Sequence, residues 1–209
     1  MRAIRVGILI FNDVEVLDFT GPYEVFTTAA RIHARSHAVD AVDAAANALF
    51  QVSLIAERLA PVRARAGLNV LPNVDLTNHP PIDLLIVPGG VVTQEVAKPH
   101  VVNWIRQVAA STIITASVCT GAFLLAKAGL LDGKRVTTHW EDLDELRTSF
   151  PSLRVEENIR WVDEGDRVTS AGISAGIDMS LHLVERLAGR DLAIKTARQM
   201  EFDWAKVPT

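Results

Sequence analysis

The sequence of 209 residues contains a single cysteine, so no disulfide can form within the chain. Small secreted scaffolds depend on several such bonds, and this absence argues against that class. No apolar run approaches the roughly 20 residues that a membrane-spanning helix needs. The 21 Lys and Arg residues are scattered and outnumbered by 25 Asp and Glu, which leaves no basic stripe for nucleic acid. We therefore expect a cytoplasmic protein that binds neither membranes nor nucleic acid.

The apolar segments that are present alternate between two kinds. Hydrophobic residues make up 49% of the chain, enough for one well-buried domain over residues 1–209. Short runs rich in β-forming residues begin at Ile4, Leu49, Asp83, Ser111, Arg135 and Arg167. Helix-like stretches follow at 22–33, 93–109, 121–128, 139–150, 176–187 and 191–204. Runs that are apolar on both faces suit buried strands, so the pattern predicts an α/β fold with a mostly parallel sheet wrapped by helices.

Two segments fall outside this alternation. Residues 34–48 are rich in Ala and Asp, and they either extend the first helix or form a separate excursion. Residues 158–168, NIRWVDEGDRV, place two apolar runs around DEGD, which predicts a hairpin and an antiparallel edge to the sheet. Ligands of open parallel sheets bind beyond the carboxyl ends of the strands, so the loops that follow strands are the candidate site.

Cys119 lies in one of these loops, within TIITASVCTGAFLLAKAGLLDG, which predicts a strand, a sharp turn and a helix. A turn of this kind holds its central residue exposed and strained, as in the nucleophile elbow of hydrolases. The start of the following helix favours an anion and lowers a thiol pKa. The alternative is a buried structural cysteine, and the turn favours the reactive thiol over it.

Asp18 lies at the mouth of the first strand, in NDVEVLDFTGPYEVF. The pair Gly21-Pro22 indicates a helix start, which places Asp18 just before the helix. A carboxyl group in apolar surroundings has a raised pKa and can hold or donate a proton. Capping of the helix is the alternative, and this segment alone favours neither.

Gly89 and Gly90 follow the buried run DLLIVP and could offer amide N–H groups to an oxyanion or a thiolate. A plain turn explains the two glycines equally simply, and the third glycine of a dinucleotide fingerprint is missing. His139 follows Cys119 by one helix and one strand, so neighbouring loops could bring a base to the thiol, or His139 could cap the next helix. The remaining histidines lack metal-ligand spacing, and we predict no metal site.

Several separated motifs together resemble the ThiJ/PfpI superfamily over nearly the whole chain. They are LDFTGPYEVF, DLLIVPGG, SVCTGAFLLAKAGLLDGKRVTTHW and TSAGISAGIDMSLHLVE, in that order. The resemblance is strongest to the isonitrile hydratase branch and to the amidotransferase-like N-terminal domain of AraC-type regulators. It implies a flavodoxin-like, amidotransferase-like sheet in a single domain, and a homodimer.

The same resemblance implies roles for the residues already singled out. Cys119 would be the nucleophile, Asp18 its acidic partner, and the backbone amides of Gly90 and Thr120 would surround the thiol. Thr120 stands where the protease-like branch has His, and Asp18 where the chaperone and deglycase branch has Glu, which favours the hydratase branch.

The function that we expect on this basis is hydration of an isonitrile to an N-substituted formamide through a thioimidate on Cys119, with no cofactor and a small-molecule substrate. One alternative is a glyoxalase-type conversion of 2-oxoaldehydes to 2-hydroxy acids, with Asp18 or His139 moving the proton. Another is a non-catalytic redox or ligand sensor in which Cys119 is oxidised to a sulfinate.

Overall fold

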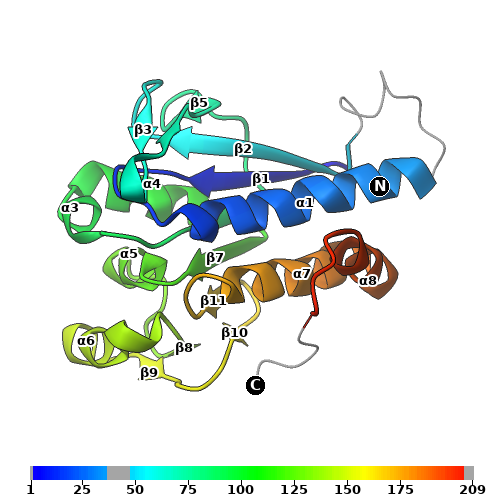
Figure 1. The fold of residues 1–209 in the computed structure, drawn as a ribbon. Coiled ribbons are helices and arrows are strands. Elements are labelled where there is room, and N and C mark those ends of the chain that lie inside the picture. Colours follow the sequence, from blue (N-terminus) through cyan, green and yellow to red (C-terminus); the bar gives the residue numbers. More distant parts are fainter. Residues whose placement is uncertain (1, 37–47, 205–209) are drawn as a thin grey trace.

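The main sheet of the protein has seven strands, in the order β10-β11-β7-β6-β1-β2-β5 (Figure 1). A computed structural model describes residues 2–36 and 48–204. The strands of this sheet are β1 (Ile4–Leu9), β2 (Phe50–Ala56), β5 (Val74–Asp75), β6 (Leu84–Val87), β7 (Ile114–Val118), β10 (Trp161–Asp163) and β11 (Arg167–Ser170). Every neighbouring pair is parallel except β10 with β11, which confirms the mostly parallel sheet and its antiparallel edge.

Helices cover both faces of this sheet, as the alternating pattern predicts. They are α1 (Val16–Ser36), α3 (Thr93–Val96), α4 (Pro99–Ala109), α5 (Gly121–Lys127), α6 (Leu143–Ser149), α7 (Ala175–Ala188) and α8 (Arg190–Gln199). Helices α1, α7 and α8 contact one another, and Figure 1 shows α1 and α7 running side by side along the sheet. Helices α3, α4 and α5 form a second group of mutual contacts. Among the described residues, no helix is both long enough and apolar enough to cross a membrane.

The first helix begins earlier than Gly21-Pro22 predicts. Helix α1 starts at Val16 and carries Pro22 in its interior, so Asp18 lies in its first turn and not ahead of it. Proline in a helix removes one backbone hydrogen bond. The buried positions Phe19, Pro22 and Phe26 follow helical spacing across the proline, and their burial against the sheet offsets that loss.

Other boundaries differ from the predictions for local reasons. The stretch 93–109 divides at Pro99, which begins α4 because proline suits the first helical position. The run at Arg135 forms β8 (Arg135–Val136), which pairs with β9 (Arg154–Val155) in a separate two-stranded sheet and does not join the main one. Helix α8 ends at Gln199, short of residue 204. Of the segment 34–48, helix α1 takes the part up to Ser36, and most of the remainder lies outside the described residues.

Two small elements carry no strong sequence signal. A hairpin of β3 (Val62–Arg63) and β4 (Asn69–Val70) follows β2, with a short 3-10 turn, η1 (Arg65–Gly67), between its strands. Each of these strands has only two residues, which is too few for an alternating pattern to appear.

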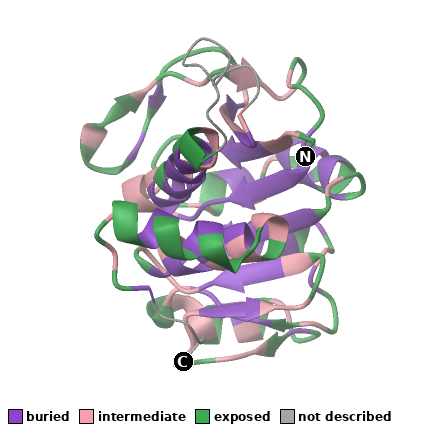
Figure 2. Ribbon diagram, turned by 90° about the vertical axis from the view of Figure 1, so that its right-hand side faces the viewer, coloured by how far each residue is buried: buried purple, intermediate pink, exposed green. Residues whose placement is uncertain are grey.

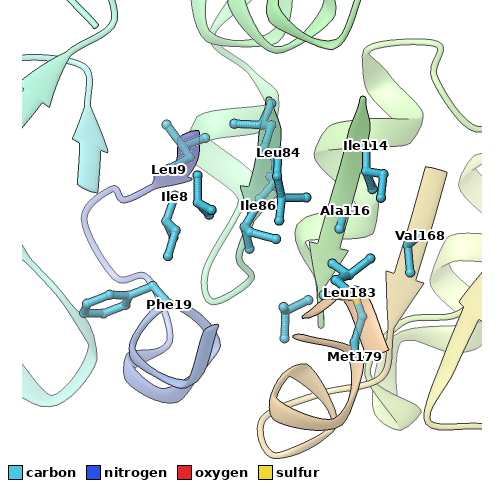
Figure 3. Close-up of a cluster of buried hydrophobic side chains, with 14 of the residues drawn as sticks. Ile8, Leu9, Phe19, Leu84, Ile86, Ile114, Ala116, Val168, Met179 and Leu183 are labelled. Atoms are coloured by element: carbon cyan, nitrogen blue, oxygen red, sulfur yellow. The ribbon is translucent and has the colours of Figure 1, made fainter. Parts of the chain in front are cut away.

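The core lies between the sheet and its two helical layers. Strands β6 and β7 are buried along their whole length. Figure 3 shows side chains of β1, β6, β7 and β11 meeting those of α1 and α7, among them Ile8, Ile86, Ile114, Phe19 and Met179. Figure 2 shows the same arrangement as buried strands beneath helices whose outer surfaces are exposed. Because the central strands are parallel, the loops after β1, β6, β7 and β11 meet at one edge of this rigid core.

Candidate active site

Cys119 occupies a strained turn between β7 and α5. Its φ angle is 56°, in the left-handed region that residues with a Cβ rarely adopt. The Cys119 N–H donates to the Ser170 carbonyl at 3.1 Å, and the Thr138 hydroxyl donates to the Cys119 carbonyl at 2.9 Å. These bonds hold both backbone groups of the turn. The strained elbow that the sequence predicts is therefore confirmed.

The elbow is pressed against the end of β6 at two glycines. A Cβ added to Gly121 would lie 2.0 Å from the Val87 carbonyl oxygen. A Cβ added to Gly89 would lie 2.5 Å from the Thr120 nitrogen and 2.9 Å from the Cys119 Cβ. Real side chains do not fit such distances, so the two backbones approach this closely only because both positions are glycine.

The Cys119 side chain is buried, and the expectation of an exposed residue with a lowered pKa is wrong. The residue is only 6% exposed. Burial raises the pKa of the Cys119 thiol, and the negative charge of Asp18 raises it further. A hydrogen bond from the Thr120 backbone amide acts in the opposite direction but is the weaker influence. Helix α5 has just seven residues, and its positive end does not outweigh the loss of water around the sulfur.

Asp18 is completely buried and faces the elbow. Its Oδ2 accepts a hydrogen bond from the Gly89 amide at 3.0 Å, and its Oδ1 accepts one from the Ile173 amide at 3.2 Å. The carboxyl also hydrogen-bonds the Cys119 thiol. Its acceptors are thus engaged by the loops after β6 and β11 and by the elbow, which makes the helix-capping alternative wrong.

Burial raises the pKa of Asp18 to about 7, although its hydrogen bonds favour the charged form. The nearby charge of Glu15 raises this pKa as well, and the charge of Asp142 raises the pKa of Cys119. Near neutral pH, therefore, the thiol keeps its proton while Asp18 is about half ionised. A carboxylate that accepts the thiol proton and can return it is the arrangement that proton transfer to or from a nucleophile requires.

Gly90 and Thr120 are hydrogen-bonded to each other, so the Gly90 amide and the Thr120 hydroxyl are not free to donate to the sulfur. The Gly90 N–H donates to Thr120 Oγ1 at 2.9 Å, and the same hydroxyl lies 2.9 Å from the Gly90 carbonyl, to which it donates. The Gly89 amide is likewise engaged by Asp18. Of the backbone donors expected around the thiol, the Thr120 amide is the one that bonds the sulfur. A role for Gly89 and Gly90 in binding substrate stays a prediction.

His139 lies beside the site and precedes the short turn η2 (Trp140–Asp142). Its Nδ1 accepts a hydrogen bond from the Glu141 amide at 3.4 Å and lies 3.4 Å from Asp142 Oδ2. Its ring packs on Gly172, where an added Cβ would lie 2.2 Å from the His139 Cδ2. Within the described part of the chain, no hydrogen bond or ion pair joins His139 to Cys119. The direct contacts of His139 therefore fit the alternative in which it caps the turn that follows it.

Sequence reasoning missed the backbone of Ile173, whose φ angle is 55° and whose amide bonds Asp18. The motif SAGISAG, which begins at Ser170, reads as a tight helix entry. Its position after β11, at the same edge of the sheet as Asp18 and Cys119, is the signal that could have identified it. Over residues 2–36 and 48–204, no group of three or more His, Cys, Asp or Glu is placed to hold a metal ion.

A cavity of about 390 Å³ opens next to the elbow, on the side of β8 and β10. Trp140, which is 73% exposed, stands at this cavity, as do Leu143 and Ile159. Thr138 and Ala171 also line it, and both bond the backbone of Cys119. The cavity thus adjoins the backbone of the elbow, whereas the side chains of Cys119 and Asp18 are not among the residues that line it.

Fold and site together define an α/β protein whose acid–thiol pair is built on a strained turn at the carboxyl edge of a parallel sheet. Residues 4–186 match the model of the DJ-1/PfpI family. The chain belongs to this family, which the motif resemblance identifies from sequence.

Three known proteins show how the chain relates to others. It is 35% identical over 201 residues to isonitrile hydratase of Pseudomonas putida, covering 96% of this chain and 79% of that protein. It is 31% identical over 191 residues to the HTH-type transcriptional regulator CdhR of Pseudomonas aeruginosa, covering 91% of this chain but 53% of the regulator. A THiJ/PfpI family protein from Pseudomonas syringae superposes with a TM-score of 0.83 at 25% identity, covering 98% of this chain and 77% of that structure. The chain therefore spans most of one relative and about half of the regulator.

Proposed function

We propose that the protein hydrates an isonitrile to an N-substituted formamide, with Cys119 as nucleophile and Asp18 as the group that moves the proton. One observation carries this proposal. The buried Asp18 carboxyl, with a pKa raised to about 7, hydrogen-bonds the Cys119 thiol on a strained elbow. A relative that is 35% identical over almost the whole chain is an isonitrile hydratase, which supports the same chemistry here.

The first step adds the S–H of Cys119 across the terminal carbon of R–N≡C. Asp18 takes the thiol proton as the sulfur attacks, and it then delivers that proton to the same carbon, giving the thioimidate R–N=CH–S–Cys119. One proton is used, and Asp18 returns to its ionised state. The Thr120 amide, which bonds the sulfur, stabilises the negative charge that the sulfur carries during the attack.

The second step consumes one water molecule. Its oxygen adds to the thioimidate carbon and a proton goes to nitrogen, giving R–NH–CH(OH)–S–Cys119. The C–S bond then breaks with loss of the hydroxyl proton, which releases R–NH–CHO and restores the thiol. Asp18 is placed to take the water proton and to return it to the sulfur, because its carboxyl already bonds that atom.

The burial of the thiol favours an isonitrile over bulkier electrophiles. The reacting carbon of an isonitrile is terminal and carries no other substituent, so it can approach a residue that is 6% exposed. A peptide carbonyl carries groups on both sides and needs an open cleft.

A second candidate function is ligand or redox sensing without turnover. The observation that favours it is the match to CdhR, in which this chain corresponds to about half of a transcriptional regulator. In that case Cys119 would be oxidised or would bind an effector reversibly, and the proton exchange with Asp18 would not lead to product.

The test is turnover of p-nitrophenyl isocyanide and cyclohexyl isocyanide with no cofactor added, with the formamide followed by NMR. Methylglyoxal, assayed in parallel, tests the glyoxalase alternative. The expected result is formamide from the wild-type protein and none from Cys119→Ser. Turnover of methylglyoxal alone would favour the glyoxalase, and no turnover of any of the three would favour the sensor.

A further inference from the structure

We propose that the backbone of Gly172 and Ile173 is a positioning element, which fixes the Asp18 carboxyl for its proton exchange with Cys119. The Ile173 amide donates to Asp18 Oδ1 at 3.2 Å from the loop between β11 and α7. This deepens the proposed function, on which its consequence for turnover rests. The placement of Asp18 by the loop does not depend on the identity of the substrate.

The conformation of Ile173 indicates that this amide donor is held in place at the expense of backbone strain. Its φ angle is 55°, a region that is strongly disfavoured for β-branched side chains. Backbone strain of this kind persists only where the surrounding structure over-determines it. In the described chain, Asp13, Ala66, Cys119, Asn158 and Glu201 are the other non-glycine residues with positive φ. None of them is β-branched, which sets Ile173 apart.

His139 supports this loop from one side. Its ring lies so close to the Gly172 Cα that any side chain there would overlap the ring. The peptide between Gly172 and Ile173 carries the N–H that reaches Asp18, so the ring limits how that peptide can rotate. His139 thereby acts on the site through the loop and not as a base on the sulfur.

Arg160 supports the loop from the other side. Its carbonyl accepts a hydrogen bond from the Ala171 amide at 2.9 Å, and its Nη2 donates to Ser174 Oγ at 3.2 Å. Its Nε is paired with the buried carboxylate of Asp178 in α7. The two residues that flank Gly172 and Ile173 are therefore both tied to Arg160, Ala171 through its backbone carbonyl and Ser174 through its side chain, which is itself paired with the buried Asp178.

Few titratable and hydrogen-bonding groups act on the Asp18 carboxyl. Glu15 acts on Asp18 from the segment before α1, and the Cys119 thiol acts on it from the elbow. Asp142, in the turn η2, acts on Cys119 and not on Asp18. The loop after β6 contributes the Gly89 amide and the loop after β11 the Ile173 amide. Removing the Ile173 donor therefore takes away one of two backbone bonds that favour the ionised carboxyl.

The test is the titration of the Asp18 carboxyl carbon by NMR in protein labelled with ¹³C-aspartate, with the signal assigned through Asp18→Asn. An amide-to-ester substitution at Ile173 removes the donor and leaves the side chain. We expect its titration midpoint to rise by about one pH unit, since a lost bond to a charged acceptor is worth at least that much. Ile173→Gly, which keeps the N–H but frees the backbone, should give a smaller rise.

Ile173→Val is the matched control, because it keeps both the amide and the β-branched constraint, and its midpoint should equal that of the wild type. A purely structural role for the loop would lower the melting temperature of the ester and Gly variants without moving the Asp18 midpoint, and that result would overturn the inference. Should the ester variant not fold, Ile173→Gly decides alone. A shifted midpoint in a protein that turns over no isonitrile would uphold the positioning role and refute the proposed function.

Discussion

Replacing Asp18 by Asn should change how folding stability depends on pH, because the wild-type protein buries a carboxyl that titrates. The pKa of Asp18 rises from its ordinary 3.8 to about 7 in the folded chain, mainly through burial. Between these values the folded chain binds a proton that the unfolded chain has released, so the free energy of unfolding falls as pH rises. Roughly three pKa units at about 1.36 kcal/mol each give a total loss of about 4 kcal/mol.

Asn removes this titration but cannot accept both hydrogen bonds, whereas both oxygens of Asp18 can accept in either protonation state, because the hydroxyl oxygen of a carboxylic acid keeps acceptor capacity. Asp18 accepts from the amides of Gly89 and Ile173, whereas an Asn side chain has one acceptor oxygen and one NH₂ donor. One amide is left facing a donor, at a cost of about 1–3 kcal/mol. The variant should therefore be less stable than wild type near pH 4, and it should equal or exceed wild type above pH 7, where the wild-type loss is complete.

The assay is urea unfolding followed by tryptophan fluorescence, at pH values on either side of the window from about 4 to about 7. Asp191→Asn, at the exposed start of α8, is the control and should follow the wild-type curve. The titrating groups other than Asp18 are common to wild type and Asp18→Asn and cancel in the difference between their curves. Parallel stability curves for wild type and Asp18→Asn would refute the raised pKa and, with it, the proton exchange built on it.

Three further outcomes follow from the same geometry. The kcat/KM for an isonitrile should rise with pH through about 7, as Asp18 becomes able to take the thiol proton, and a flat profile would contradict this role. Gly89→Ala should lower both the urea midpoint and the activity, because its Cβ would lie 2.5 Å from the Thr120 nitrogen; an unchanged midpoint would show that the elbow can shift freely. Light scattering at micromolar concentration should give twice the chain mass, since the motif resemblance implies a homodimer, and a monomer would contradict that expectation.

The architecture was open to prediction because its signals are long and redundant. Fully apolar runs such as those of β6 and β7 can only be buried strands when helices alternate with them. The start of α1 was not predictable from Pro22, since local preference places proline at the first turn while tertiary burial of Phe19 extends the helix beyond it. Strand β8 shows the same limit, because a two-residue run does not say which sheet it joins.

The residues of the site could be predicted from the sequence, but their hydrogen bonds and their burial could not. Cys119 and Asp18 are recognisable from their loops, and the structure brings them into contact. The direction of the thiol pKa was wrong, because the sequence shows the helix that follows Cys119 but not how completely the site excludes water. Ile173 was missed because its contribution is a backbone N–H, and any residue type carries that group.

The two most strained residues near the site, Cys119 and Ile173, both bond the same buried carboxyl. Each left-handed conformation costs of order 1–3 kcal/mol, and the buried, ionising Asp18 adds about 4 kcal/mol above pH 7. The fold does not require the strain at position 173, which Gly would relieve, or the ionisation of position 18, which Asn would remove. A nucleophilic thiol needs a nearby group that can take its proton and return it. A rigid core that holds Cys119 beside a partly ionised Asp18 meets this need. The coincidence of strain and unfavourable burial at a single carboxyl therefore argues that this corner of the molecule is built for chemistry and not for stability.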